Sequence, residues 1–428
     1  MTFDPQKLHA LAVSLHGRRA GVITRLPGDK QLFTLDEAYA QDPARPTLSL
    51  SFKSQTGGLM TAVGPVRRRL PPFFSNLLPE GHLRAYLAEQ AGVNPEREFF
   101  LLAALGADLA GAATIAPLDH RDNTVAPADA AAADDDPTAG GAIAEGRRRG
   151  ALRFSLAGVQ LKFSAVLKSS GGLTIPAHGV GGSWIVKLPS MRFAAVAENE
   201  FAMLELARAI GIAVPRIQLV PVKRIEGLPP EAARLEGNAL TVERFDRTPE
   251  GRRVHMEDFA QVFGILPENK YKSVSYSNIA RVLRAETGEQ GTTEFVRRLV
   301  FSVLIGNGDM HLKNWSLLYP DTRTPVLSPA YDFVSTVPYS PGDRLALTFG
   351  ESRALEEITW EQIRRFVDKA GMPMSSTLRT VADTVEATVA AWQSLGPKDI
   401  LPADIRGAID AQINRAAART ATALTGRH

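Results

Sequence analysis

The chain has 428 residues, more than one ordinary hydrophobic core holds, so two or three domains are expected. Its 44% hydrophobic and 22% charged residues are typical of a soluble globular protein, and no apolar run approaches the roughly 18 residues of a membrane span. The lack of cysteine excludes disulfides, thiolate metal sites and cysteine nucleophiles, and it fits a cytoplasmic protein without a secretory signal. A net charge of +3 does not demand a nucleic-acid partner.

Residues 1–118 have the pattern of a small α+β domain. Short strand-like runs fill residues 11–50, and the Pro-Gly-Asp sequence at 27–29 interrupts one of them in the way a hairpin turn does. Two helices are expected next, one ending near Gly92 and one over residues 96–105.

Residues 119–150 differ from the rest of the chain in composition. This segment is rich in Ala, Asp, Gly and Pro and has almost no large apolar residue. Such a segment cannot bury a core, because it has little apolar surface to remove from water. It is therefore predicted to be a flexible linker between two domains.

The remainder divides into a β-rich part, 151–246, and a mainly helical part, 247–428. Short β-rich runs fill most of the first part. They are interrupted by "AENEFAMLELARAIGIAVP", in which Phe201, Leu204 and Ile210 recur at helical spacing. The order of elements thus predicts an α+β protein with a sheet lobe followed by a helical lobe.

The stretch "IGNGDMHLKNWSLLY", residues 305–319, holds a dense polar cluster between two apolar runs. Asp309, His311, Lys313 and Asn314 lie within six positions. Polar groups are costly to bury without partners, so a cluster flanked by core-like segments needs a structural or chemical reason.

Other polar residues stand alone along the β-rich part and beyond it. Lys187 lies in an apolar strand, Glu200 follows early in the next helix, and Asp332 comes after a short strand. The turn "SLAGVQLK", 155–162, precedes them all. Phosphoryl transfer from ATP uses such groups, because it needs a phosphate-binding turn, a lysine for the phosphates, a glutamate to aim it, a base and oxygen ligands for magnesium.

The spacing of these residues is that of a kinase. Asp309 precedes Asn314 by five positions, the interval of the kinase loop His-Arg-Asp-x-x-x-x-Asn, and Asp332 follows 18 positions later with a phenylalanine after it. Each residue alone has an ordinary explanation, as a helix or turn cap, an edge-strand charge or a first-turn acid. Their joint occurrence in kinase order favours the catalytic interpretation.

The chain resembles the HipA family of bacterial serine/threonine protein kinases, which act as toxins of type II toxin–antitoxin modules. The resemblance rests on "SLAGVQLK", "WIVKLP", "ENEFAMLELARAIGIAVP", "VERFDR", "IGNGDMHLKNWSLL" and "YDF" in this order, and on "FFSNLLPEG" at residues 73–81. It implies a two-lobed protein-kinase-like fold of the α+β class, with a β-rich lobe at 151–246, a helical lobe at 247–428 and an added N-terminal domain.

The resemblance also implies a role for each polar residue. Asp309 would be the catalytic base, His311 would brace the catalytic loop and Lys313 would lie near the transferred phosphoryl group. Asn314 and Asp332 would bind Mg²⁺. The ATP site would comprise Lys187 with its partner Glu200, the phosphate-loop residues Ser155, Ala157, Gly158, Val159 and Gln160, and the hinge residues Glu243, Arg244 and Phe245.

Three departures from ordinary protein kinases suit the HipA pattern. The phosphate loop has one glycine, Gly158, the residue before the catalytic aspartate is Gly308, and Val334 stands where Asp-Phe-Gly has its glycine. In "HMEDFAQVFG" a helix start is expected, and its His255 and Gln261 either line the nucleotide side or belong to a capped core helix.

The function implied is an ATP- and magnesium-dependent serine/threonine protein kinase that arrests growth. The substrate would be a translation component such as an aminoacyl-tRNA synthetase, and autophosphorylation of Ser155 would silence the kinase. A HipB-like antitoxin would be the partner that contacts DNA, which fits the modest net charge of +3. Two alternatives are a small-molecule kinase and a non-catalytic scaffold that joins a repressor on DNA.

Overall fold

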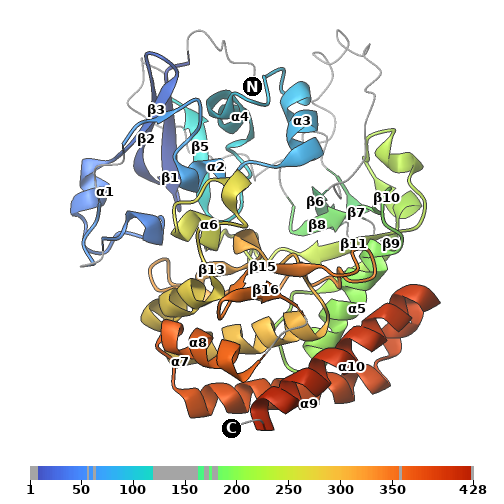
Figure 1. Cartoon of the computed structure of the whole chain (residues 1–428). Coiled ribbons are helices and arrows are strands. Elements are labelled where there is room, and N and C mark those ends of the chain that lie inside the picture. Colours follow the sequence, from blue (N-terminus) through green and yellow to red (C-terminus); the bar gives the residue numbers. More distant parts are fainter. Residues whose placement is uncertain are drawn as a thin grey trace.

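The computed structural model has the two lobes and the added N-terminal domain expected from the sequence (Figure 1). The N-terminal domain, in blue, lies beside the β-rich lobe, in green, and both rest on the helical lobe, in yellow to red. The predicted linker and the predicted phosphate loop lie outside the described residues. These are 8–54, 57–60, 64–118, 162–167, 173–175, 182–355 and 359–425.

A five-stranded antiparallel sheet forms the N-terminal domain, in the order β4-β3-β2-β1-β5. The hairpin turn lies where it was predicted, because Gly28 and Asp29 both have positive φ between β2 and β3. The strands are β1 (Ala10–Leu15), β2 (Arg18–Leu26), β3 (Lys30–Leu35), β4 (Val66–Arg67) and β5 (Ala113–Pro117), and the helices are α1 (Glu37–Gln41), α2 (Pro72–Ser75), α3 (Gly81–Gln90) and α4 (Glu98–Leu105).

The core of this domain fixes the segment that leads to α3. Phe33 and Phe74 pack with ring centroids 4.7 Å apart. The fully buried Glu98 of α4 accepts hydrogen bonds from the backbone N–H of Leu70 at 2.9 Å and the hydroxyl of Ser75 at 3.0 Å. A buried carboxylate needs such partners, so this acid ties the segment to α4.

The β-rich lobe is a six-stranded sheet in the order β10-β7-β6-β8-β11-β9. The antiparallel register of β6 and β8 puts Lys162 opposite Lys187. Helix α5 (Val196–Ala209) packs against β9 and β11 of this sheet. The strands are β6 (Lys162–Leu167), β7 (Leu173–Thr174), β8 (Trp184–Lys187), β9 (Ile217–Pro221), β10 (Ile225–Glu226) and β11 (Asn238–Glu243).

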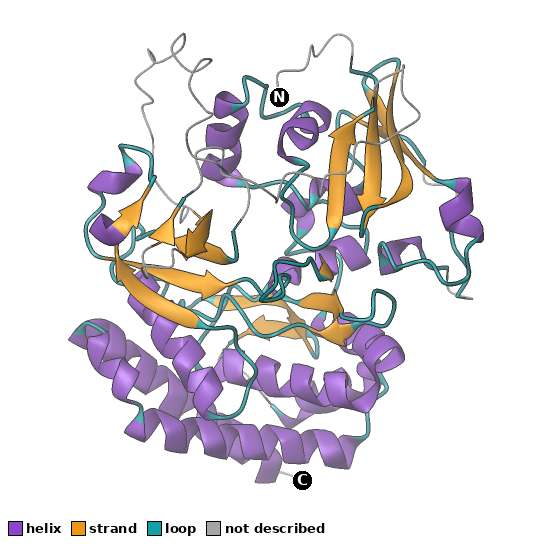
Figure 2. Cartoon of the chain, turned by 180° about the vertical axis from the view of Figure 1, so that it is seen from behind, coloured by secondary structure: helices purple, strands orange, loops and turns teal. Residues whose placement is uncertain are grey.

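Long helices form most of the C-terminal lobe and lie below the strands in Figure 2. Helix α7 bends at Gly288, whose φ of 71° and ψ of −157° interrupt the helix. In the described part of the chain, no helix is both long and apolar enough to cross a bilayer. The helices are α6 (Phe259–Val262), α7 (Tyr276–Leu304), α8 (Trp360–Ala370), α9 (Met374–Ser394) and α10 (Ala403–Thr425).

Short strands also occur in this lobe, and the helical pattern did not reveal them. The helix start predicted at Met256, Glu257 and Asp258 is correct only at Asp258, which is the N-cap of α6, because Met256 and Glu257 belong to β12. Asp258 caps α6 through a reciprocal pair of hydrogen bonds with Gln261. The added strands are β12 (His255–Asp258), β13 (Ser316–Tyr319), β14 (Val326–Leu327), β15 (Arg344–Phe349) and β16 (Ser352–Ala354).

A buried ionic cluster joins the N-terminal domain to the end of the β-rich lobe. Arg244 and Arg247 both contact Asp246, with nitrogen–oxygen distances of 2.8 Å. Arg247 also lies 3.0 Å from Asp108 of the N-terminal domain, and the backbone N–H of Gly111 donates to Asp246 at 2.8 Å. All four charges are paired, as buried charges must be.

A second buried polar group joins the N-terminal domain to the helical lobe. Glu257 of β12 accepts hydrogen bonds from the hydroxyls of Ser49 and Tyr319, each at 2.5 Å. Burial raises the pKa of Glu257 to about 7. His255 beside it lies 2.8 Å from the carbonyl oxygen of Leu48, and burial lowers the pKa of this histidine to about 4.

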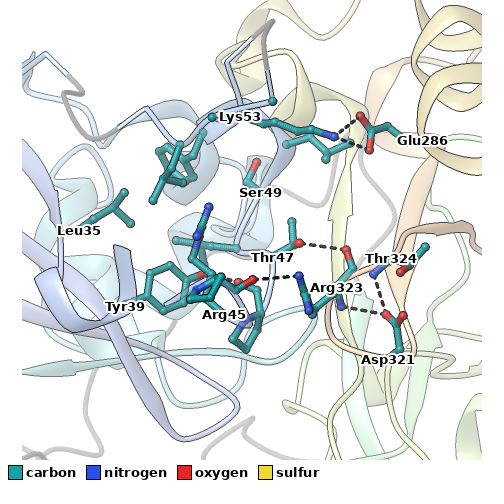
Figure 3. A pocket seen from close by; sticks show the side chains of 18 residues that line it. Leu35, Tyr39, Arg45, Thr47, Ser49, Lys53, Glu286, Asp321, Arg323 and Thr324 are labelled. Carbon is teal, nitrogen blue, oxygen red and sulfur yellow. Dashed lines mark hydrogen bonds and ion pairs between the residues drawn. The ribbon is translucent and has the colours of Figure 1, made fainter. Parts of the chain in front are cut away.

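A cavity of about 400 Å³ lies on this boundary, as Figure 3 shows. Lys53 of the N-terminal domain reaches across it to Glu286 of α7 at 2.7 Å. The hydroxyl of Thr47 donates to the carbonyl of Arg323 at 3.0 Å. The cavity walls include no residue of the polar cluster at 309–314, so this opening is separate from that cluster.

Candidate active site

A buried ion-pair triad lies between the two lobes. Lys187 ends β8, and its ammonium group contacts the carboxylates of Glu200 on α5 and Asp332 in the segment after β14. The side chains of Lys187 and Glu200 are only 5% and 4% exposed. Burial alone would lower the pKa of Lys187, but the two carboxylates outweigh it and raise this pKa above its ordinary value.

Lys162 is a second cation at the triad, and the sequence analysis did not single it out. Its ammonium group lies 3.2 Å from a carboxylate oxygen of Asp332. Burial works to raise the pKa of Asp332, but Lys162 and Lys187 together hold it below its ordinary range. Lys162 is the last residue of "SLAGVQLK", but no local pattern marked it as a site residue. The sheet register, in which Lys162 lies opposite Lys187, brings it to the triad.

The polar cluster at 309–314 forms the loop between α7 and β13. The side-chain amide of Asn314 donates to the carbonyl oxygen of Asp309 at 2.8 Å, and the backbone N–H of Asp309 donates to Asn307 at 3.0 Å. The Cβ of any larger residue at Gly308 would come within 2.2 Å of Asp343. Packing against Asp343 thus accounts for glycine in the position before the aspartate.

The carboxylate of Asp309 is held by a tyrosine that the sequence analysis did not identify. The hydroxyl of Tyr271 donates to Oδ1 of Asp309 at 2.6 Å, although 38 positions separate the two residues. Burial raises the pKa of Asp309, and the Tyr271 hydrogen bond works in the opposite direction. The tyrosine is itself 39% exposed, so the aspartate lies close to the molecular surface.

His311 packs beneath this pair. Its ring meets the ring of Tyr271 edge to face, with centroids 5.0 Å apart. Burial lowers the pKa of His311 to about 3, and its Nδ1 atom has no hydrogen-bond partner among the described residues. A neutral, packed imidazole suits the bracing role expected for His311 better than proton transfer.

Lys313 points from the loop towards the N-terminal domain. Its ammonium group lies 2.7 Å from Oε1 of Glu80 and donates to the carbonyl oxygen of Asn76 at 3.2 Å. The other oxygen of Glu80 lies 2.7 Å from Lys270. The expected position of Lys313 near a transferred phosphoryl group stays a prediction.

The three hinge residues differ in what they leave available to a nucleotide. The guanidinium group of Arg244 is fully paired within the buried cluster at the domain boundary. The backbone N–H of Arg244 donates to the carbonyl oxygen of Ser183 at 2.7 Å. Phe245 packs on Tyr331 at 5.5 Å between centroids, and the side chain of Glu243 is half-buried. An Arg244 contact to adenine would therefore have to come from the backbone carbonyl.

His255 and Gln261 serve the domain boundary and not the nucleotide side. His255 approaches the carbonyl of Leu48, and the side-chain amide of Gln261 donates to the carbonyl of Phe73 at 3.0 Å. Both side chains are buried. The sequence left open whether these two residues line the nucleotide side or only pack in the core, and their contacts favour packing in the core.

The oxygen donors of the site suit magnesium. The carboxylate of Asp332 contacts two ammonium groups, those of Lys187 and Lys162. The Lys162 side chain is 44% exposed, so a metal ion could take its place at the Asp332 oxygen. The amide nitrogen of Asn314 donates to the carbonyl oxygen of Asp309, so the amide oxygen of Asn314 is the atom that can bind a cation. Among the described residues no cluster of three or more His, Asp or Glu could hold a metal, so phosphates and water would complete the coordination.

These elements together define a site with the layout of a protein kinase. A sheet lobe holds the Lys187–Glu200 pair, a loop after a long helix presents Asp309 and Asn314, and a second aspartate, Asp332, faces the lysine. The five phosphate-loop residues predicted from the sequence, Ser155, Ala157, Gly158, Val159 and Gln160, lie outside the described residues.

Comparison with known proteins narrows this class to a family. Residues 154–392 match the HipA-like C-terminal domain, and residues 11–116 match the HipA N-terminal domain. The protein Y4dM of Sinorhizobium fredii is 51% identical over 391 residues, which cover 91% of this chain and 92% of that protein. The chain therefore belongs to the HipA family, as the sequence analysis predicted.

One named relative and one solved structure are similar to this chain at lower sequence identity. The serine/threonine-protein kinase toxin HipA of Shewanella oneidensis is 27% identical over 350 residues, which cover 74% of this chain and 76% of that protein. A structure described as HipA and HipB of Shewanella oneidensis MR-1 with operator DNA aligns over 96% of both chains, with a TM-score of 0.69 at 22% identity. This likeness confirms the fold.

Proposed function

We propose that the chain is an ATP- and magnesium-dependent serine/threonine protein kinase. The observation that carries the proposal is the Lys187 ammonium group held between Glu200 and Asp332, with Asp309 near enough to interact with the charge of Asp332. An ammonium group fixed in this way is ready to bind phosphate oxygens, and phosphoryl transfer depends mainly on such positioning and charge neutralisation. Asn314 and Asp332 would hold magnesium, which neutralises the phosphate charge.

In this mechanism Asp309 accepts the proton of the acceptor hydroxyl. The hydroxyl oxygen bonds to the γ-phosphorus as the bond from that phosphorus to the β–γ bridging oxygen breaks, and ADP leaves. Partial desolvation by the surrounding protein raises the pKa of Asp309, which makes its carboxylate a better proton acceptor than an aspartate fully surrounded by water. The loop keeps the carboxylate in place because Asn314 and Asn307 bond the backbone of Asp309.

The biological role proposed is that of a growth-arresting toxin of a type II toxin–antitoxin module in the cytoplasm. The name of the Shewanella relative and the HipA–HipB–DNA structure support this role, with a HipB-like antitoxin as the partner that contacts DNA. The substrate would be a translation component such as an aminoacyl-tRNA synthetase. Phosphorylation of Ser155 by the kinase itself would switch it off.

The decisive variant is Asp309→Asn, which keeps the shape of the side chain and removes the base. We expect phosphoryl transfer to fall by roughly a thousandfold or more. The measurement is mass spectrometry of phosphoserine and phosphothreonine in cells that express the wild type or the variant, together with growth. Asp399→Asn is the matched control, since Asp399 is 72% exposed in the helical lobe.

Three outcomes would contradict the proposal. Equal phosphorylation and equal growth of wild type and Asp309→Asn would favour a non-catalytic scaffold. ATP turnover with a metabolite and without any protein acceptor would favour a small-molecule kinase. Unphosphorylated Ser155 in wild-type protein incubated with ATP and magnesium would exclude the proposed self-inactivation.

A further inference from the structure

One carboxylate of the N-terminal domain pairs with two lysines that belong to the two segments around Asp309. Glu80 pairs with Lys313 on the loop that carries Asp309, and with Lys270, the residue before the tyrosine that bonds Asp309. Both nitrogen–oxygen distances are 2.7 Å. The two lysines come from different segments of the helical lobe, so Glu80 joins them across the domain boundary.

The side chain of Glu80 is not used by its own helix. The residue stands at the N-cap of α3, but its carboxylate makes no capping hydrogen bond there. It is directed to the two lysines instead. Burial works to raise the pKa of Glu80, but Lys313 and Lys270 outweigh it and lower this pKa to about 2, so the carboxylate stays charged at neutral pH.

Neighbouring contacts make the same connection rigid. The side-chain amide of Asn76 donates to the carbonyl of Ile265 at 2.7 Å, and the carbonyl of Asn76 accepts from Lys313. The backbone N–H of Leu312 donates to the carbonyl of Lys270 at 3.3 Å. The segment that ends at Glu80 is thus fixed on the helical lobe, and the two lysine-bearing segments are fixed on each other.

Glu80 is not needed to attach the N-terminal domain. The buried cluster of Arg244, Arg247, Asp246 and Asp108 and the hydrogen bonds of Glu257 already hold the boundary elsewhere. The side chain of Glu80 is 36% exposed, whereas Asp108 is 4% exposed. A half-exposed ion pair contributes little to stability, so its effect lies in the geometry that it imposes on the loop.

We propose that Glu80 is a positioning residue for phosphoryl transfer, through which the N-terminal domain completes the active site of the helical lobe. Through Lys313 it orients the loop that carries Asp309. Through Lys270 it orients the segment whose Tyr271 hydroxyl holds the Asp309 carboxylate. This inference rests on the proposed kinase function.

The test is Glu80→Gln in the full-length protein, with Glu89→Gln as the matched control because Glu89 is exposed on the same helix. We expect Glu80→Gln to lower kcat about tenfold or more and to change KM for ATP less than about twofold, since a misplaced catalytic group slows chemistry while the nucleotide contacts remain. In a background that carries both Lys313→Met and Lys270→Met, the same substitution should cost less than about twofold, because both routes from Glu80 are then removed.

A second measurement does not depend on activity. Hydrogen–deuterium exchange of residues 267–272 and 305–315 should rise in Glu80→Gln and stay at the wild-type level in Glu89→Gln. Unchanged exchange, or a kcat equal to or above that of wild type, would overturn the positioning role. Wild-type protein that transfers no phosphate would refute the kinase proposal, and the exchange data would still decide whether Glu80 orders the loop.

Discussion

The triad around Lys187 and the contacts around Asp309 lie near each other but depend on different parts of the chain. Lys187, Glu200 and Asp332 all belong to the two lobes, and their charges compensate one another in a buried setting. By contrast, the carboxylate of Asp309 accepts a hydrogen bond from Tyr271, and the ammonium group of Lys313 pairs with Glu80 of the N-terminal domain.

This difference separates two requirements of phosphoryl transfer. Phosphate binding needs a fixed cation, and the lobes supply it without help from the N-terminal domain. Alignment of the proposed base with an acceptor hydroxyl needs a fixed loop, and we propose that the N-terminal domain contributes to it through Glu80. We therefore expect changes on the triad side to affect both stability and activity, and changes on the Asp309 side to affect mainly activity.

The largest effect is expected for Lys187→Met. Removal of the ammonium group leaves the carboxylates of Glu200 and Asp332 in a buried site without their shared partner. Such a loss destabilises a protein by about 3–5 kcal/mol. Denaturant unfolding should show this decrease, and the variant should not transfer phosphate.

Lys162→Met is the matched control for this experiment. It removes a neighbouring cation from the same Asp332 carboxylate, but Lys162 is 44% exposed and its pair is screened by water. Its effect on the free energy of unfolding should stay below about 1 kcal/mol. Equal effects of the two substitutions would show that the buried triad is not the stabilising unit.

The next effect concerns the domain boundary and depends on pH. Burial raises the pKa of Glu257 from 4.5 to about 7, so between these pH values the folded protein keeps a proton that the unfolded chain releases. The wild type therefore loses stability as the pH rises through this window, by about 3 kcal/mol in total. Relative to wild type, Glu257→Gln should gain that amount between pH 4.5 and pH 8 in denaturant unfolding.

The exposed Glu89→Gln provides the control for the pH series, because it also replaces a glutamate by glutamine but leaves Glu257 and its partners unchanged. A Glu257→Gln difference that is constant across the series would mean that Glu257 keeps its charge at the boundary. The hydroxyls of Ser49 and Tyr319 would then be sufficient to stabilise a buried carboxylate.

The smallest effect is expected for Tyr271→Phe, which removes one hydrogen bond from Asp309. That bond lowers the pKa of Asp309, so its loss should move the acidic limb of the kcat/KM profile to higher pH. The ring that packs on His311 remains, so the melting temperature should hardly change. An acidic limb that stays in place would show that the Tyr271 hydroxyl does not act on the base.

Much of the fold and the order of the site residues could be predicted from the sequence, because both depend on local patterns. Five positions separate Asp309 from Asn314, and one short turn is enough to bring them into contact. The hairpin at 27–29 likewise follows from residues that accept positive φ. The pairing of Lys187 with Glu200 was predicted, and the structure places the two in contact. Asp332 was predicted as a magnesium ligand, and its contact with Lys187 came only from the structure.

The short strand at His255 was misjudged because four residues are too few to establish a period. Arg244 was predicted as a hinge residue beside adenine, and its buried contact with Asp108, 136 positions away, could not be predicted from a local pattern. Lys162 shows the same limitation, because only the register between β6 and β8 places it beside Asp332.

The sequence by itself determined which residues can perform phosphoryl transfer and in what order they occur, because residue type and short spacing fix the chemistry that is available. Only the tertiary structure decided which partners hold them. Glu80 and Lys313 are 233 positions apart, and no local pattern connects them. Their contact results from the docking of the N-terminal domain, whose geometry depends on buried charges and packing along the whole boundary.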